Sequence, residues 1–149
     1  IKLDKRIIII EGNLDYGELI NLYGSCDALI SLHRSEGFGR CLAESFLLGL
    51  DVLATNWSGN TDFCDGPLYS PVDFTLRSVL PYEYPHASDQ FWAEPDLNDA
   101  SQKLLTIYNK RSKNKINSLE YYNYYYKKFS LDSIGLNYYN RLYELGLLS

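Results

Sequence analysis

The sequence predicts an α/β domain: a Rossmann-like parallel sheet with flanking helices, followed by a helical C-terminus. Short runs that are apolar almost throughout alternate with segments whose apolar residues recur at helical spacing. A strand buried on both faces has this uninterrupted apolar composition. Strands that alternate with helices are typical of a parallel sheet covered by helices on both sides.

Composition limits the classes to which the protein can belong. The chain has 149 residues, 46% of them hydrophobic, so one domain spanning residues 1–149 can bury its own core. The net charge of −5 argues against nucleic acid as a partner, because phosphate binding needs clustered lysine and arginine. The apolar runs are too short for a bilayer, and no signal peptide is evident. We expect a cytoplasmic protein, and the lack of an initial Met suggests a fragment.

The three cysteines, Cys26, Cys41 and Cys64, are widely spaced and form no CxxC pair. This spacing predicts neither a disulfide framework nor a zinc site. Because their neighbours are apolar, we expect buried, reduced thiols.

The first predicted strands and helix are apolar segments bounded by turn or capping residues. Arg6–Ile10 is a β-branched run and predicts the first strand. Leu14–Gly24 predicts a helix that Asp15 can cap and Gly24 can end. Asp27–Leu32 predicts the second strand.

The pattern continues once more and then loosens. Gly39–Leu50 predicts a helix closed by Gly49, and Asp51–Thr55 predicts the third strand. Residues 56–90 hold four of the five prolines and predict a long irregular region. Phe91–Ala93 is a candidate for a short fourth strand.

A helix is expected at residues 97–110, with Asp96 or Asn98 as its cap. Its apolar residues predict one inward-facing stripe. The stripe consists of Leu97, Ala100, Leu104, Leu105 and Tyr108.

Residues 111–149 predict C-terminal helices that pack on the domain. They cover Lys113–Lys128, which is rich in tyrosine, and Ser130–Leu145, which Ser130 or Asp132 can cap. Packing against the sheet or another helix explains the tyrosines better than a membrane surface does, because few basic residues accompany them.

Ligands of open parallel sheets bind where strands end. Three loops follow predicted strands here: Glu11–Asp15, His33–Arg40 and Asn56–Asp65. The second enters a helix through Gly37 and Gly39, so exposed N–H groups and the helix dipole favour an anion there. The dinucleotide fingerprint lacks its third glycine, and no P-loop or Asp-x-Asp motif is present. No metal or other cofactor is expected.

Two glutamates flank this glycine elbow. Glu36 lies in the loop and Glu44 lies about one turn into the helix. A carboxylate near a helix start can be a purely structural feature. A glycosidase pair is the other alternative, but such a pair must face one bond from two sides, which this spacing does not specify.

The stretch "LISLHRSEGFGRCLAESFLLGLDVLATNWSGNTDF" resembles the donor-site signature of retaining GT-B glycosyltransferases of the family-four, or "group 1", type. The "WAEPD" stretch resembles the later part of that domain in mannosyl- and rhamnosyl-transferase-like members. The resemblance covers roughly residues 4–110. It implies that the chain is the distal part of a C-terminal donor-binding domain.

The resemblance also implies roles for single residues. Glu36 would be the catalytic residue beside the donor sugar, and Glu44 would accept hydrogen bonds from the ribose hydroxyls of a nucleotide-sugar. Arg34, close to Glu36, is a weaker candidate, since a solvated arginine is more common. The other donor-binding residues implied are Gly37, Phe38, Gly39, Arg40, Asn60 and Thr61.

The implied reaction moves a sugar from GDP-mannose or a similar donor to a glycan or lipid-linked acceptor, with retention and without a metal. The family's acceptor-binding N-terminal domain and its diphosphate-gripping Arg and Lys are absent from this sequence. We therefore expect weak donor binding and no transferase activity from this chain alone, and peripheral membrane association of the parent.

Two other classes remain as alternatives. A non-catalytic Rossmann-like module that binds a nucleotide or a partner would share the scaffold. A flavodoxin-like or response-regulator-like domain would need an acidic cluster or flavin-phosphate loop at Glu11–Asn13, which supplies neither.

Overall fold

The computed structural model describes residues 4–113 and 118–148. The helices are α1 (Tyr16–Gly24), α2 (Arg40–Leu47), the 3-10 turn η1 (Gly59–Asp62), α3 (Leu97–Lys113), α4 (Ser118–Phe129) and α5 (Leu131–Glu144). The strands are β1 (Ala28–Ser31), β2 (Asp51–Thr55), β3 (Tyr69–Val72), β4 (Phe74–Ser78) and β5 (Phe91–Pro95).

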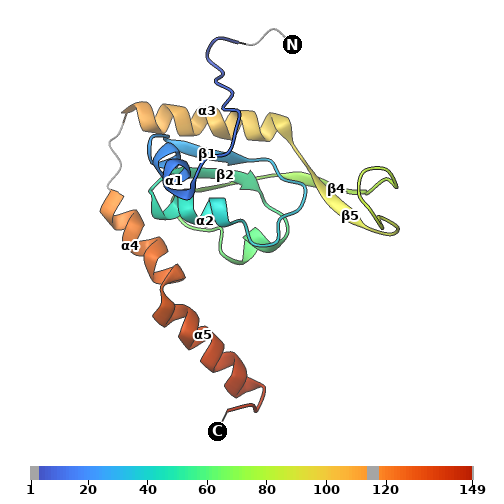
Figure 1. The fold of residues 1–149 in the computed structure, drawn as a ribbon, viewed down its shortest axis with the longest axis vertical. Helices are drawn as coiled ribbons and strands as arrows, with labels where there is room; N and C mark the ends of the chain where they lie inside the picture. Colours follow the sequence, from blue (N-terminus) through green and yellow to red (C-terminus); the bar gives the residue numbers. More distant parts are fainter. Residues whose placement is uncertain (1–3, 114–117, 149) are drawn as a thin grey trace.

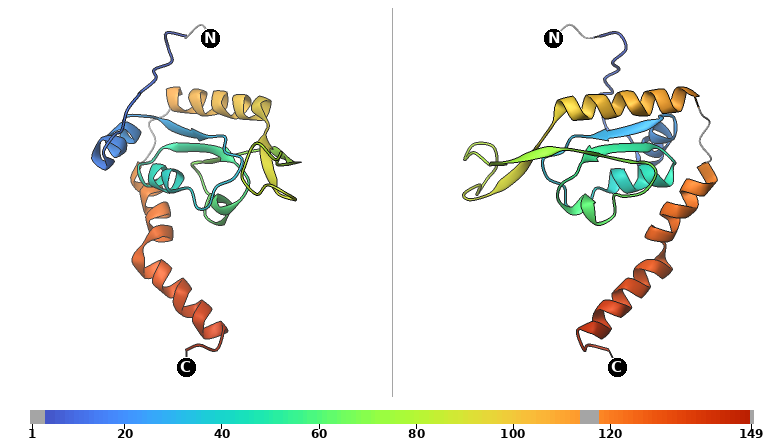
Figure 2. Two further views of the ribbon diagram at one scale, coloured as in Figure 1. Left: turned by 45° about the vertical axis from the view of Figure 1, so that its right-hand side comes forward. Right: turned by 180° about the vertical axis from the view of Figure 1, so that it is seen from behind.

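A parallel sheet in the order β1-β2-β3 forms the centre of the molecule. Val52 of the middle strand is level with Leu29 on one side and Tyr69 on the other. Helix α3 lies along one face of this sheet and α2 along the other (Figures 1 and 2). The prediction of an α/β fold with a parallel sheet, flanking helices and a helical C-terminus is confirmed.

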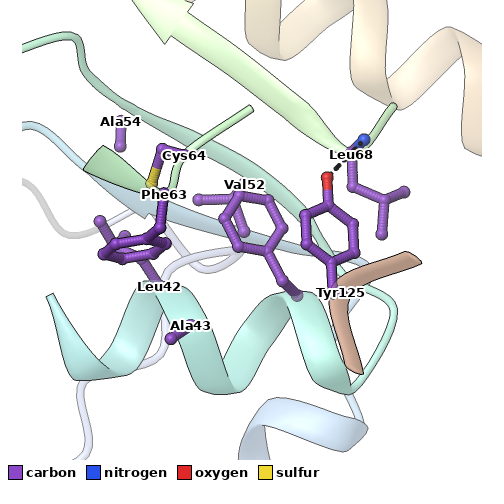
Figure 3. Close-up of a cluster of buried hydrophobic side chains, with 9 residues drawn as sticks. Leu42, Ala43, Val52, Ala54, Phe63, Cys64, Leu68 and Tyr125 are labelled. Carbon is purple, nitrogen blue, oxygen red and sulfur yellow. Dashed lines mark hydrogen bonds between the residues drawn. The ribbon is translucent and has the colours of Figure 1, made fainter. Parts of the chain in front are cut away.

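Strand β2 is buried along its whole length, including the polar residues Asp51 and Thr55 at its two ends. Its alternate side chains supply two core clusters. Val52 and Ala54 pack on the α2 side with Phe46 and Tyr125, and Figure 3 shows this cluster. Leu53 packs on the α3 side in the second cluster. The second cluster also contains Val72, Ala100 and Ile107.

A buried ion cluster fastens α3 to the sheet. Asp51 begins β2 and is only 2% exposed. Lys110 and Arg111 reach its two carboxylate oxygens at 2.8 and 2.7 Å. Because a buried carboxylate without partners is strongly destabilising, these two cations fix the position of the helix on the sheet.

The predicted first strand, Arg6–Ile10, is wrong. Ile7–Ile10 are 54–83% exposed and lie outside the sheet, whose first strand in the structure is β1. The chain bends before them, where the N–H of Ile7 donates to the carbonyl of Asp4 at 2.9 Å. β-Branched residues favour a strand only where a neighbouring strand pairs with them, and none does so in the described chain.

The irregular region predicted for residues 56–90 contains structure. β3 adds to the central sheet, and β4 pairs antiparallel with β5 to form a hairpin that projects from the body (Figure 1). The short strand expected at Phe91–Ala93 is thus confirmed as part of β5, but it pairs with β4 and lies outside the central sheet.

Local sequence signals at the helix ends are largely confirmed. Asp15 forms a reciprocal capping box with Glu18, and Ser130 accepts from the N–H of Ser133. Asp96 is the cap of α3, since its carboxylate accepts from the next turn's N–H groups at 2.8 and 3.1 Å. Gly49 follows α2 with a φ of 79°, a conformation that suits glycine.

The inward stripe predicted for α3 is only partly correct. Ala100 is buried, but Leu97, Leu105 and Tyr108 are 60–69% exposed. The face turned to the sheet instead carries Ala100 and Ile107, both 5% exposed, and the last turns of α3 pair with Asp51. The predicted stripe therefore omitted Ile107, and the ion pairs with Asp51 fasten the helix in the rotation that buries this residue.

The two C-terminal helices differ in their packing. Tyr125 of α4 is fully buried and stacks on Phe46 with ring centres 4.3 Å apart. Tyr122, Tyr124 and Tyr126 are 40–52% exposed and pack only at the surface, where Tyr122 stacks on Tyr126 and the Tyr124 hydroxyl donates to Asp65. Helix α5 has no buried residue in the described chain and extends away from the body (Figure 1). Among the described helices, none has both the length and the apolar character needed to cross a membrane.

The three cysteines are free, but only Cys64 is buried. The expectation of three buried thiols is therefore wrong for the exposed Cys26 and only partly right for Cys41. Burial raises the pKa of the Cys64 thiol to about 12.

Thiol reactivity tests this difference. Because the thiolate is the reactive species, iodoacetamide at pH 8 should label Cys26 quickly and Cys64 slowly in the folded protein. Timed labelling followed by peptide mass spectrometry measures both rates, with the unfolded protein as the control. Equal rates in the folded protein would contradict the described burial.

Tyr125→Phe tests the polar anchor of α4. The Tyr125 hydroxyl donates to the carbonyl of Asp65 at 2.8 Å and accepts from the N–H of Leu68 at 3.2 Å. Removing it leaves a buried N–H unpaired, so we expect the free energy of unfolding to fall by about 1–3 kcal/mol. Urea unfolding measures the change, and Tyr126→Phe, at an exposed position, is the matched control.

Candidate functional site

Two loops meet at the carboxyl edge of the central sheet. One follows β1 and contains Glu36, and the other follows β2 and contains Ser58 and Gly59. The Ser58 hydroxyl accepts from the N–H of Glu36 at 2.6 Å and donates to the carbonyl of the same residue at 2.8 Å. The N–H of Gly59 donates to that carbonyl at 2.9 Å. The backbone of Glu36 is therefore held from both sides.

The loops touch so closely that only glycine fits at position 59. A Cβ placed on Gly59 would lie 1.7 Å from the carbonyl oxygen of Gly37. By contrast, a Cβ on Gly37 would meet nothing within 4 Å. The two glycines therefore have different functions: Gly59 permits the contact, and Gly37 supplies the backbone that is contacted.

His33 and Asn60 connect the same loops beneath the surface. Nε2 of His33 lies 3.1 Å from Oδ1 of Asn60 and 3.2 Å from the carbonyl of Trp57. Both partners are acceptors, so Nε2 carries the proton and Nδ1 accepts from Ser31. Asn60, a predicted donor-binding residue, is fully buried, and its amide donates to the carbonyl of Thr55. Its side chain thus fixes the loop from within.

The start of α2 is shaped by Gly39. This residue precedes the helix with a φ of 89°, and a Cβ there would lie 2.9 Å from Cδ1 of Leu42. The turn brings the N–H groups of the first helical turn to the carboxyl edge of the sheet. The N–H groups of Phe38 and Gly39 donate to no other described residue. Free N–H groups at a helix start attract an anion.

Glu36 lines a cavity of about 650 Å³ between this loop and the β4–β5 hairpin. The N–H of Gly37 donates to the Glu36 carboxylate at 3.1 Å. The cavity lining comprises Ser35, Glu36, Gly37, Val79, Tyr84, Pro85, His86, Gln90, Phe91 and Trp92. Glu36 therefore has a firmly held backbone and is one of the residues that line this open cavity.

Glu44 lies on α2 and does not line that cavity. Its carboxylate accepts from the hydroxyl of Tyr16 at 3.2 Å and pairs with Arg40 at 3.3 Å. Burial raises the pKa of the Cys41 thiol, and the negative charges of Glu36 and Glu44 raise it further. The structure thus places the Glu44 carboxylate beside Tyr16 and Arg40, outside the cavity that Glu36 lines.

The remaining predicted residues lie at the surface of the same region. Phe38 is 51% exposed, and its ring centre is 4.6 Å from that of Phe63. The Arg40 side chain is 75% exposed, and Thr61 is exposed with its hydroxyl bonded to the carbonyl of Ser58. The structure thus gathers the predicted residues around the start of α2, with Asn60 facing inward.

A charged clamp, comprising Arg34, Arg77, Glu83, Glu94 and Trp92, holds the hairpin against the Glu36 loop. Both guanidinium groups reach Oε2 of Glu94 at 3.0 Å, and Arg77 also pairs with Glu83 at 2.7 Å. The two guanidiniums lie 5.0 and 4.8 Å from the ring centre of Trp92. Bonding to Arg77 lowers the pKa of Glu83 to about 2. Arg34 is therefore engaged in the clamp, unlike the solvated arginine expected.

Sequence reasoning missed the hairpin wall of the cavity. The alternation of apolar and polar residues in Phe74–Ser78 is a strand signal that could have revealed β4. No sequence signal shows that the loop between β4 and β5 lines the same cavity as Glu36.

Within the described ranges, no group of three or more His, Cys, Asp or Glu side chains could hold a metal ion. The chain matches no protein-family model, and no curated protein or solved structure is significantly similar to it.

Gly59→Ala tests the contact between the loops. The added methyl group must push the backbone of Gly37 away, so we expect a loss of about 1–3 kcal/mol in unfolding free energy. Gly37→Ala is the matched control, because its methyl group meets open space. Thermal unfolding of both variants measures the difference, and equal stability would refute the close contact.

Proposed function

We propose that this chain is the distal part of the nucleotide-sugar-binding domain of a retaining GT-B glycosyltransferase, with a Rossmann-like sheet. The observation that carries the proposal is the arrangement around α2. A glycine elbow at the carboxyl edge of a parallel sheet presents free N–H groups, with one carboxylate on each side. Ligands of open parallel sheets bind at this edge.

The start of α2 would bind the diphosphate of the donor. Its free N–H groups and the helix dipole favour negative charge, and the exposed Arg40 adds a cation. Phe38 and the neighbouring glycines would contribute their backbone, and Thr61 would border the pocket. Asn60 would act by holding the loop in place, given its burial.

Glu44 would bind the ribose. A carboxylate can accept hydrogen bonds from both vicinal hydroxyls at once. In the structure, the Glu44 carboxylate already binds one hydroxyl, that of Tyr16, and one cation, the guanidinium of Arg40. Ribose hydroxyls would replace the Tyr16 hydroxyl, and Arg40 would become available to the diphosphate.

Glu36 would act at the donor sugar. Glu36 lines the cavity, and its carboxylate would stabilise the positive charge that develops at the anomeric carbon during transfer. We further propose GDP-mannose or a related donor, a glycan or lipid-linked acceptor, and cytoplasmic action with peripheral membrane association of the parent. The chain alone would bind its donor weakly, because the family's upstream Arg and Lys are not part of it.

Glu44→Ala tests the ribose assignment. Titration calorimetry of the chain with GDP-mannose and UDP-glucose should show weak binding by one of them. The variant should raise the dissociation constant about tenfold or more, as expected when a charged hydrogen-bond partner is lost. Glu144→Ala, at an exposed position on α5, is the control and should bind as the unaltered chain does.

Glu36 has a different expected signature. In a protein that also contains the acceptor domain, Glu36→Ala should lower turnover far more than nucleotide affinity. Unchanged nucleotide binding in Glu44→Ala, or unchanged turnover in Glu36→Ala, would contradict the proposed roles.

A further inference from the structure

The cavity beside Glu36 has a second wall that the donor motif does not supply. This wall comes from the β4–β5 hairpin, which projects beyond the carboxyl edge of the sheet (Figure 1). The hairpin residues that line the cavity are Val79, Tyr84, Pro85, His86, Gln90, Phe91 and Trp92. Most of them are apolar or aromatic, so the wall differs in chemistry from the polar loop it faces.

Two aromatic rings of this wall are exposed. Tyr84 is 65% exposed and Phe91 is 60% exposed, so neither ring serves the core. Exposed rings that line a cavity of about 650 Å³ are available to a ligand. Small-molecule sites commonly have about this volume, and most are lined by aromatic groups with a few polar ones.

The charge of the lining narrows the ligand class. Among the described lining residues there is no lysine or arginine, and Glu36 is the single carboxylate. A phosphate would meet this negative charge with no lysine or arginine in the lining. The guanidiniums of Arg34 and Arg77, which lie against the Trp92 ring, are already bonded to Glu94. The cavity therefore suits an uncharged ligand that carries hydrogen-bond donors.

A pyranose ring has the matching chemistry. One of its faces presents C–H groups that pack on aromatic rings, while its hydroxyls can donate to a carboxylate and bond to amide groups. Tyr84 and Phe91 offer the rings, and Glu36 and Gln90 offer the polar partners. Both surfaces of a sugar ring would thus find a partner in one cavity.

The wall is held in place relative to Glu36. Arg34, two residues before it, bonds to Glu94 of β5 through two guanidinium nitrogens at 3.0 and 3.1 Å. The backbone carbonyl of Arg34 also accepts a hydrogen bond from the N–H of Ala93 at 2.9 Å. Such a clamp lets a ligand bind without first ordering the hairpin.

We propose that this cavity is a subsite for an uncharged pyranose ring at the end of the acceptor. The assignment of this ring to the acceptor rests on the proposed function, in which the donor's nucleotide binds at the start of α2. Glu36 then lies between the two substrates, and the hairpin gives the donor-binding domain a direct part in acceptor recognition.

Free glycosides test the subsite. Saturation-transfer NMR of the chain with the methyl α-pyranosides of mannose, glucose, galactose and rhamnose should detect binding of at least one. Phe91→Ala and Tyr84→Ala should each weaken it about tenfold, and Phe91→Tyr, which keeps the ring, should retain it. Tyr82→Ala is the matched control, because Tyr82 lies in the same loop, is 83% exposed and does not line the cavity.

A competition arm separates acceptor from donor. Glycoside binding should persist at saturating GDP-mannose or UDP-glucose. Displacement of the glycoside by the nucleotide-sugar would overturn the acceptor assignment, since the cavity would then hold the donor's sugar. Absence of glycoside binding, or equal binding by Phe91→Ala, would overturn the subsite. If glycosides bind through Tyr84 and Phe91 while no nucleotide-sugar binds, the sugar subsite is supported and the proposed function alone fails.

Discussion

The backbone of Gly59 passes so close to the carbonyl of Gly37 that no side chain fits between them. The rest of the site depends on this contact. It joins the loops that leave two neighbouring parallel strands, and Ser58 completes it by bonding both backbone groups of Glu36. The loop that bears Glu36 is thereby fixed by a neighbour in space that lies more than twenty residues away in sequence.

The hairpin is attached to this loop by a second device, the charged clamp. Its ion pairs are partly exposed, and isolated pairs of this kind contribute little to stability. Here several charges share partners and lie against one indole ring, so the clamp mainly sets position. The clamp includes Arg34, so the residue that holds the hairpin lies only two positions before Glu36, which lines the cavity.

The region around α2 divides into two chemical environments. At the helix start, free N–H groups and Arg40 favour an anion. In the cavity, the lining has aromatic side chains and one carboxylate but no lysine or arginine, which favours an uncharged polyol. A nucleotide-sugar and a glycan acceptor together carry both kinds of group, and the two environments meet at Glu36.

The sequence by itself determined the alternation of elements, the cap at Asp15 and the loop that carries the glycine elbow, because these depend on local chemistry and side-chain spacing. For the other two helices it offered Asp96 or Asn98 and Ser130 or Asp132, and the structure has Asp96 and Ser130 as the caps. Only the tertiary structure decided which segments pair and which faces are buried. Ile7–Ile10 have strand-forming side chains but no partner strand in the described chain. Helix α3 turns Ala100 and Ile107 to the sheet and leaves Leu105 and Tyr108 exposed. The hairpin wall of the cavity could not be predicted from the sequence either. Its position relative to Glu36 depends on the bond between Arg34 and Glu94, which are about sixty positions apart.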